Sequence, residues 1–457
     1  MCYTCEVMNQ NDLTQGSIKA AIRRIAIPSS IGFLFNTLFN VVDTFYAGQL
    51  SVPALAGLTA AFPIFIIIIA LASGVGTGST ALAAISLGKK DRHDYHLLAK
   101  NAIFFSTLIA IILALMMPFI LPFLFSISGA EGEVLDAGMS YMYIIMGASI
   151  FQILNFTFNG LLSAQGNTKP FRNFLIVGFL LNLFLDPLFI FGWFGLPQLG
   201  TAGVALATVV VQALGTLYLG WSFFRSSLFE RSMFASVKIN KTTMRALLKQ
   251  GLPVSLSNAT IAIGIFIIQF FIYRYGNDQT LAGYGVAVRI EQIALLPTIG
   301  LNIATLAIAG QNYGAKFYQR IEQTYRQAIK YAFILLGIGL LILYPFAPQL
   351  VAFFNDDPNV IQEGVGYLRI EGLAIFTYSL IGISTSILQA IKKPYLGLMI
   401  GLIRQLSPIF VFYLLGDIFN LGMNGVWWGI VIVNYLATIL AWSLVSKLLK
   451  PLLKSTL

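Results

Sequence analysis

Two aspartates lie inside long apolar segments, where a charged side chain is costly and usually serves a function. Asp43 is the first, and Asn36, Asn40 and Asp43 fall at helical positions i, i+4 and i+7, so they share one face. A carboxylate in a membrane-spanning helix costs roughly 3 kcal/mol and commonly marks an ion or substrate path. The alternative is a structural aspartate that its neighbours satisfy by hydrogen bonds.

The second carboxylate, Asp186, lies four residues after Asn182, so the two side chains share a helix face. Pro187 has no N–H group and predicts a kink, because a carbonyl one turn earlier loses its hydrogen-bond partner. Thr208, in a further apolar segment, is another candidate. Two carboxylates that meet in a dry site can share a proton, or can bind a small cation such as Na⁺ through hard oxygen ligands.

A third polar stripe consists of Asn155 and Asn159, which are again four residues apart. Together these segments could build one polar chamber in the first half of the chain. For each amide the alternative is ordinary hydrogen bonding between helices. Pro28 lies about four helical turns before Asp43 and predicts a bend, which is either a moving hinge or a fixed kink.

The chain that carries these residues is strongly apolar. Of its 457 residues, 57% are hydrophobic and 10% are charged, and the mean hydropathy is +0.81. No soluble domain could cover that much apolar surface, so the predicted class is an all-α integral membrane protein. The net charge of +10 comes from Lys and Arg in short loops, which argues for the positive-inside pattern and against nucleic acid as a partner.

Twelve apolar segments are long enough to cross a bilayer, which takes about 20 residues. The loops alternate in charge, one set rich in Lys and Arg and the other carrying mainly Asp and Glu. The positive-inside rule then places both termini and the central polar stretch in the cytoplasm, and the protein in the plasma (inner) membrane. The predicted spans lie near residues 24–47, 56–86, 99–124, 137–162, 171–193, 200–224, 250–274, 281–309, 327–353, 365–389, 395–416 and 424–446.

The two sets of six spans resemble each other. Pro28 recurs as Pro253, and Gly88, just before a basic turn, recurs as Gly314. An even number of spans in each repeat predicts two lobes related by a pseudo-twofold axis along the membrane normal, with a substrate path between them. The predicted domains are an N-terminal lobe over 1–224, a cytoplasmic linker over 225–249 and a C-terminal lobe over 250–457.

Several kinds of chemistry lack their sequence signatures. There is no P-loop and no glycine-rich dinucleotide motif, so an ATP-driven pump is not expected and no cofactor is predicted. His93 and His96 are the only histidines, and no further ligands near them suggest a metal site. Cys2 and Cys5 form a C-x-x-C, which is a weak signal for metal or redox chemistry. An enzyme is therefore not expected.

A series of motifs, in order along nearly the whole chain, resembles the MATE (multidrug and toxic compound extrusion) family, with the DinF-like branch the most similar. The resemblance implies a twelve-helix, two-lobed transporter that exports cationic or polar organic compounds in exchange for H⁺, with Na⁺ as the alternative ion. It also implies that cationic or amphiphilic small molecules and the lipid bilayer are the partners of a monomer. The motifs are Val42-Asp43-Thr44, Gln165-Gly166-Asn167, Leu181-Asn182 with Asp186-Pro187, Arg289-Ile290-Glu291 and Gly310-Gln311-Asn312.

The resemblance also implies a role for each candidate residue. Asp43 and Asp186 are expected to couple transport to the ion, with Asn182 and Thr208 completing their site, whether it takes H⁺ or Na⁺. Pro28 is expected to be the bend point of the first helix. The acids that the NorM-type branch carries in its C-terminal lobe have no clear counterpart in this sequence, so the ionisable groups are expected to act in the N-terminal half. The residues expected to line the substrate cavity are Asn36, Asn40, Asn155 and Asn159.

Three other functions compete with this interpretation. A flippase or exporter of a lipid-linked or specific physiological substrate on the same fold would need a basic cavity, for which Arg289, Arg369 and Arg404 are candidates. A major-facilitator transporter would need a Gly-Arg-Arg after Arg92, which is missing. An integral membrane enzyme would need clustered catalytic groups at the interface. The sequence does not determine the physiological substrate, and it leaves open whether H⁺ or Na⁺ is coupled.

Overall fold

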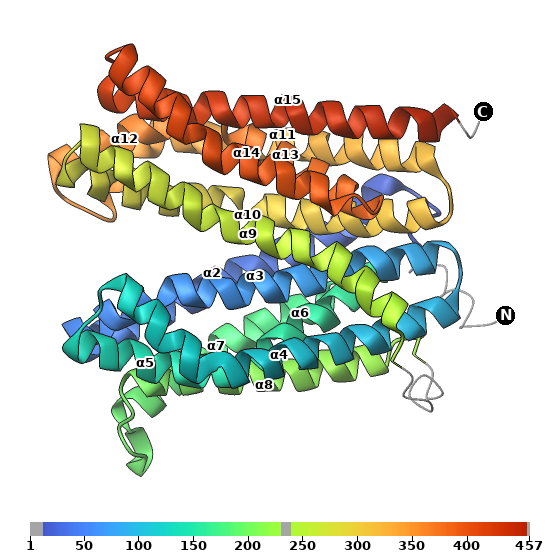
Figure 1. Cartoon of the computed structure of the whole chain (residues 1–457), viewed down its shortest axis with the longest axis horizontal. Helices are drawn as coiled ribbons and strands as arrows, with labels where there is room; N and C mark the ends of the chain where they lie inside the picture. Colours follow the sequence, from blue (N-terminus) through green and yellow to red (C-terminus); the bar gives the residue numbers. More distant parts are fainter. Residues whose placement is uncertain (1–11, 230–238, 455–457) are drawn as a thin grey trace. The chain divides into compact units, whose positions relative to one another are not determined.

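The computed structural model describes residues 12–229 and 239–454. Throughout these residues the chain is helical and contains no strand, which confirms the predicted all-α class (Figure 1). The C-x-x-C of Cys2 and Cys5 lies outside the described residues. The helices are α2 (Ile18–Leu50), α3 (Val52–Gly88), α4 (Arg92–Ser128), α5 (Gly132–Gly147), α6 (Ser149–Ala164), α7 (Lys169–Phe191), α8 (Thr201–Phe224), α9 (Lys241–Tyr275), α10 (Asp278–Gly314), α11 (Tyr318–Ala352), α12 (Pro358–Glu371), α13 (Ile375–Ala390), α14 (Pro394–Tyr413) and α15 (Gly422–Lys454).

The helices give up to twelve membrane spans among the described residues. Ten are long and apolar enough to cross a bilayer alone, and two bent pairs pass the same test together. The pairs are α5 with α6, bent by 49°, and α12 with α13, bent by 51°. Each pair is the fourth span of its half, where the hydropathy pattern predicted one straight helix. The predicted number of spans agrees with the structure, and the bends are a feature that the pattern did not reveal.

Turns at corresponding places in the two halves share an unusual backbone conformation. Lys90, which follows α3, has φ 59°, and Lys316, which follows α10, has φ 62°. Gly166 after α6 and Lys392 after α13 also have positive φ values, 74° and 61°. Non-glycine residues seldom adopt this conformation, so its recurrence at three lysines supports the repeat seen in the sequence.

The chain divides into two compact units. The first includes residues 31–255, and the second comprises residues 13–30 and 256–457. Helices α2 and α9 are therefore each shared between the units. Residues 18–30 of α2 count with the second unit, and residues 31–50 with the first. Pro28 lies two residues before this division, within the part of α2 that belongs to the second unit.

Within the first unit, α3 packs against α4, α5 and α6, and α7 lies beside α8 (Figure 1). Small residues allow close approach of backbones: a Cβ at Gly76 would lie 2.7 Å from the carbonyl oxygen of Phe156. Phenylalanines fill the layer between α2, α6 and α7, with Phe33, Phe156 and Phe174 all around the ring of Phe171. These rings bring α2 into contact with α7, the two helices that carry Asp43 and Asp186.

Within the second unit, α10 is the central helix and packs against α11, α12 and α13. Its core is aromatic: the ring of Tyr284 stacks on Trp427 with centroids 5.8 Å apart, and Tyr367 packs edge-on against both. The segment just before α2 is bound to the same unit, because the N–H of Leu13 donates to Gln311 Oε1 at 2.8 Å.

Candidate functional site

Asp43 is held in the first unit by side chains of α7 and α8. Asn182 Nδ2 donates to Asp43 Oδ1 at 2.5 Å and to Asp186 Oδ2 at 2.9 Å, so one amide joins both carboxyl groups. Thr208 Oγ1 donates to Asp43 Oδ2 at 3.3 Å. The structure therefore brings together the four residues that the sequence suggested for ion coupling. We call Asp43, Asn182, Asp186 and Thr208 the acid cluster.

The acid cluster is buried, and no cationic partner is found for it in the part of the chain that the structure describes. Asp186 and Asn182 are fully buried, and Asp43 is 7% exposed. Among the described residues no Lys or Arg forms an ion pair with either carboxyl group. Asp186 Oδ1 and Asn182 Oδ1 are buried without a hydrogen-bond partner. Buried oxygen atoms are normally satisfied, so these two mark a place where a proton or a small cation can add a favourable contact.

The kink-forming Pro187 is compensated by the neighbouring helix. Pro187 has no N–H, so the carbonyl of Leu183 lacks its normal partner within α7. Tyr46 of α2 donates its hydroxyl to this carbonyl at 3.4 Å. A second link between α2 and α7 therefore lies one turn along from the bond between Asp43 and Asn182, and the geometry of the acid cluster depends on both.

A small polar cavity of about 100 Å³ lies beside the acid cluster. Asp43 alone carries a charge among the described residues that line it, and the other polar groups are amides and a hydroxyl. Asp186 and Asn182 do not line the cavity, so Asp43 separates them from it. The lining residues are Phe33, Asn36, Phe39, Asn40, Asp43, Phe65, Ile69, Gln152, Asn155, Phe156, Phe171, Phe174, Leu175, Thr208 and Gln212.

Three of the four asparagines expected at the substrate cavity line it, and the fourth does not. Asn36, Asn40 and Asn155 line it. Asn155 is also well bonded, since its Nδ2 donates to Gln212 Oε1 at 2.7 Å and its Oδ1 accepts from Thr216 at 2.9 Å. Asn159 is buried one turn further along α6, where its Oδ1 accepts from Ser163 at 3.2 Å, and it is not among the lining residues.

Two glutamines of the cavity were not singled out from the sequence. Gln152 precedes Asn155 by three residues and Gln212 follows Thr208 by four, so each extends a polar face already recognised. Helical spacing was therefore the signal that could have found them. The phenylalanines of the lining give no such signal, because Phe is common on every face of these helices.

The second unit contains its own buried acids, which the sequence did not predict as a pair. Glu291 of α10 accepts from the Tyr367 hydroxyl at 2.9 Å, and Glu371 of α12 accepts from Tyr378 at 2.7 Å. Both carboxyl groups are at least 92% buried, and they are close enough to interact electrostatically. Arg289, two residues before Glu291, is exposed.

A cation accompanies these glutamates. Arg404 of α14 lies over the ring of Tyr378 with its Cζ 4.5 Å from the centroid, and its charge acts on both Glu291 and Glu371. Its Nε donates to Asn434 Oδ1 at 2.7 Å. We call Glu291, Glu371, Tyr367, Tyr378 and Arg404 the glutamate cluster. The expectation that ionisable groups are concentrated in the N-terminal half is thus incomplete.

Known proteins resemble this chain along almost its whole length. The MatE family model matches residues 28–188 and 253–414. The probable multidrug resistance protein YoeA of Bacillus subtilis is 26% identical over 380 residues, which cover 81% of each chain. An FAD transporter of Shewanella oneidensis is 26% identical over 451 residues, covering 98% of this chain and 99% of that protein. A solved structure of MATE in the straight conformation superposes with a TM-score of 0.91 at 26% identity, covering 97% of this chain and 99% of the other.

Proposed function

The chain belongs to the MatE family of membrane transporters, and we propose that it exports cationic organic compounds in exchange for protons. Members of this family are transporters and not enzymes, and the helices of this chain fit a multi-pass membrane protein. The direction of transport, the coupling ion and the charge of the substrate are the proposed parts.

The observation that carries the proposal is that Asp43 belongs to both the acid cluster and the cavity. Asp43 can therefore bind a proton or a cationic substrate, and the binding of one weakens the binding of the other. A ligand shifts a conformational equilibrium only through its different affinity for the two states. Competition at Asp43 supplies that difference, and it links the entry of protons to the release of substrate.

The orientation of Asn182 favours a proton over Na⁺. Its Nδ2 donates to both carboxyl groups, so the amide presents a donor and not an oxygen to the carboxylates. A sodium ion between the carboxylates would need oxygen ligands there, so the amide would have to turn around. A proton needs no such change. Since Asp43 lies between the cavity and Asp186, we expect a proton to reach Asp43 first and Asp186 second.

The lining of the cavity favours a cation with an apolar body. Asp43 supplies a negative charge, and six phenylalanines supply ring faces that attract cations. Pockets for drug-sized ligands usually measure about 300–1,000 Å³, and this cavity holds about 100 Å³. We therefore expect it to receive only part of a substrate in this conformation, and to widen when α2 rearranges near Pro28.

The proposal also states which membrane holds the protein and on which side of it the termini lie. The alternation of basic and acidic loops supports cytoplasmic termini, and we expect the protein to lie in the plasma membrane. No cofactor is required by this mechanism, because the proton gradient supplies the free energy. We expect a monomer to be sufficient, since the acid cluster and its cavity are built from one unit of one chain.

A second candidate is an exporter of one anionic physiological substrate, because one relative at 26% identity is named an FAD transporter. A site for an anion needs basic side chains. Among the described residues that line the cavity there is no Lys or Arg, so this candidate ranks second. The same argument applies to a flippase for a lipid-linked precursor.

Transport of a fluorescent cationic dye in proteoliposomes tests the proposal, with a pH gradient and a sodium gradient imposed separately. We expect dye movement with the pH gradient alone, and loss of that movement to background in Asp43→Asn. Asp136→Asn, an exposed acid on α5, is the matched control and should transport normally.

Dye movement driven only by the sodium gradient would contradict proton coupling, but would leave the proposed binding site unchanged. Retained transport in Asp43→Asn would contradict the site. Transport of an anionic dye, with none of the cationic dye, would favour the second candidate.

A further inference from the structure

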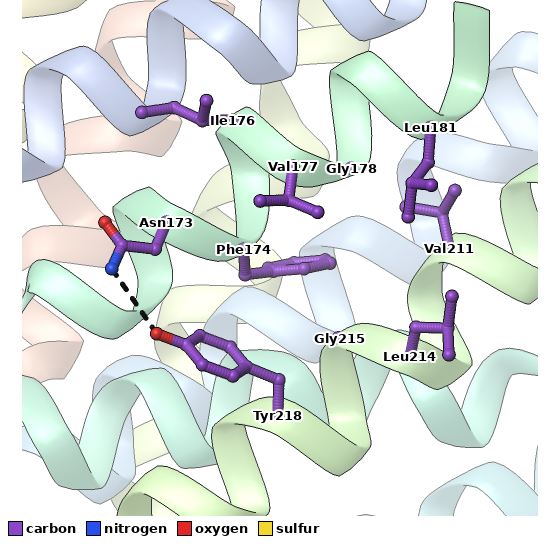
Figure 2. A pocket seen from close by; sticks show the side chains of 10 residues that line it. All are labelled: Asn173, Phe174, Ile176, Val177, Gly178, Leu181, Val211, Leu214, Gly215 and Tyr218. Carbon is purple, nitrogen blue, oxygen red and sulfur yellow. Dashed lines mark hydrogen bonds between the residues drawn. The ribbon is translucent and has the colours of Figure 1, made fainter. Parts of the chain in front are cut away.

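A second and larger cavity of about 470 Å³ lies between α7 and α8 (Figure 2). Figure 2 shows its wall: Val177 and Leu214 from the two helices, Phe174 between them, and Tyr218 at one end. Val177 is 53% exposed and Leu214 is 47% exposed, so this cavity is a groove open at the surface of the protein. Both helices span the membrane, so the groove faces the hydrocarbon chains of the bilayer.

Two glycines allow side chains of the facing helix to pack closely beneath the groove. A Cβ at Gly178 would lie 2.9 Å from Val211 Cγ1, and a Cβ at Gly215 would collide with the ring of Phe174. Phe174 can therefore lie flat against α8 and form the floor of the groove. Apart from its ends the groove offers no polar group, so an occupant must present a hydrocarbon surface.

One end of the groove is polar and basic. Asn173 Nδ2 donates to the Tyr218 hydroxyl at 3.4 Å, and Asn173 Oδ1 accepts from Arg172 Nη2 at 2.7 Å. On the other helix, the ring of Trp221 stacks on Tyr218 with centroids 6.1 Å apart, and Arg225 lies over Trp221 at 4.9 Å. Two guanidinium groups are thus anchored at the end of an apolar groove, at the ends of α7 and α8 that the positive-inside rule assigns to the cytoplasm.

We propose that this groove binds an acyl chain of an anionic phospholipid, whose phosphate lies at Arg172 and Arg225. The apolar wall matches a hydrocarbon chain, and the two guanidinium groups match a phosphate, which arginine binds well. Basic side chains next to membrane-spanning helices attract anionic lipids. A cationic substrate fits the apolar part equally well but would be repelled at the basic end, which decides between the two occupants.

The position of Phe174 gives the lipid a structural effect. One side of this ring is the floor of the groove, and Phe174 also lines the polar cavity that contains Asp43. Its ring is 6% exposed and packs against Phe171, which lines the same cavity, with centroids 5.9 Å apart. A bound acyl chain therefore supports the wall of the polar cavity from the side of the membrane.

Native mass spectrometry of the purified full-length chain tests this proposal without any measurement of transport. The chain is incubated with phosphatidylglycerol or with phosphatidylcholine of the same acyl composition, and the bound lipid is counted. We expect one phosphatidylglycerol to be retained in preference to phosphatidylcholine, and Arg172→Gln and Arg225→Gln each to weaken it about fivefold.

Leu214→Trp, which fills the groove from its exposed rim, should abolish the retained lipid. Leu180→Trp is the matched control, because Leu180 is 48% exposed on α7 and does not line the groove. If Leu214→Trp aggregates, Val177→Phe fills the groove from the opposite rim and takes its place.

Three results would overturn the proposal. The first is equal retention of the two lipids, and the second is retention that Leu214→Trp leaves unchanged. The third is equal loss of lipid in Leu180→Trp, which would mean that the whole surface and not the groove selects the lipid.

Discussion

Each of the two units buries a pair of carboxyl groups, but the side chains that surround the two pairs differ. In the acid cluster the partners of Asp43 and Asp186 are one amide and one hydroxyl, and two oxygen atoms have no partner. In the glutamate cluster two tyrosines donate to the acids, Arg404 supplies a positive charge, and one oxygen, Glu371 Oε2, has no partner. A buried charge is tolerated when it is paired and hydrogen-bonded.

The main difference is the cation, because among the described residues only the glutamate cluster has a positive charge beside it. Adding a proton to the acid cluster removes an uncompensated charge and supplies a missing hydrogen bond. Adding one to the glutamate cluster removes part of an attraction to Arg404. We therefore expect the acid cluster to respond to protons and substrate, and the glutamate cluster to contribute mainly to the stability of the second unit.

The largest effect is expected from removing the cation of the glutamate cluster. Arg404→Met removes the contact with Tyr378, the hydrogen bond to Asn434 and the positive charge near Glu291 and Glu371, and should lower the free energy of unfolding by about 3 kcal/mol. Thermal unfolding in detergent measures this. Arg274→Met is the control: it breaks an exposed ion pair with Asp417 and should change the stability little. Equal effects of the two substitutions would contradict the stabilising role of the glutamate cluster.

A somewhat smaller effect is expected from removing the amide of the acid cluster. Asn182→Leu deletes the donor to both carboxyl groups, and should cost about 2 kcal/mol of stability and abolish dye transport. The measurements are thermal unfolding and transport on the same preparation. Asn159→Leu, which affects a buried asparagine outside the cavity, should retain transport. Normal transport by Asn182→Leu would show that the bridging amide is dispensable.

The pH dependence of dye binding distinguishes the clusters directly. If a proton and a cation compete for Asp43, the affinity for dye falls as the pH falls, by at most about tenfold for each pH unit for one proton. Fluorescence titration at several pH values measures the slope. Asp43→Asn should remove the slope and Glu291→Gln should keep it. A slope lost only in Glu291→Gln would reverse the roles of the two clusters.

The smallest effect is expected from removing the Tyr46 hydroxyl, which donates to the carbonyl of Leu183 in α7. Tyr46→Phe removes the bond to Leu183 and should cost about 1 kcal/mol, with transport reduced but not lost. Tyr435→Phe removes a comparable bond to the carbonyl of Leu373 in the second unit and should leave transport unchanged. Thermal unfolding and dye transport again provide the readouts, and an equal loss of transport in both variants would remove the special role of Tyr46.

Much of this arrangement could be predicted from periodicity alone. The spacing of Asn182 and Asp186 placed both on one helix face, and the hydropathy pattern gave the number of spans. The bends within the fourth span of each half were not predicted, because no proline lies at either break to mark it. The pairing of Glu291 with Glu371 was also missed, because it depends on how α10 packs against α12 and leaves no mark in the spacing of either helix.

The division of α2 between the units has a consequence for how the chain is made. Residues 13–30 complete the second unit, where Arg320 Nη1 donates to the carbonyl of Gly16 at 3.2 Å. These residues are synthesised before residues 31–255, whereas their partners on α10 and α11 are synthesised after that segment. The C-terminal bundle therefore cannot be completed from its own half of the gene. A fragment that begins at residue 239 should assemble only when the N-terminal fragment is supplied beside it.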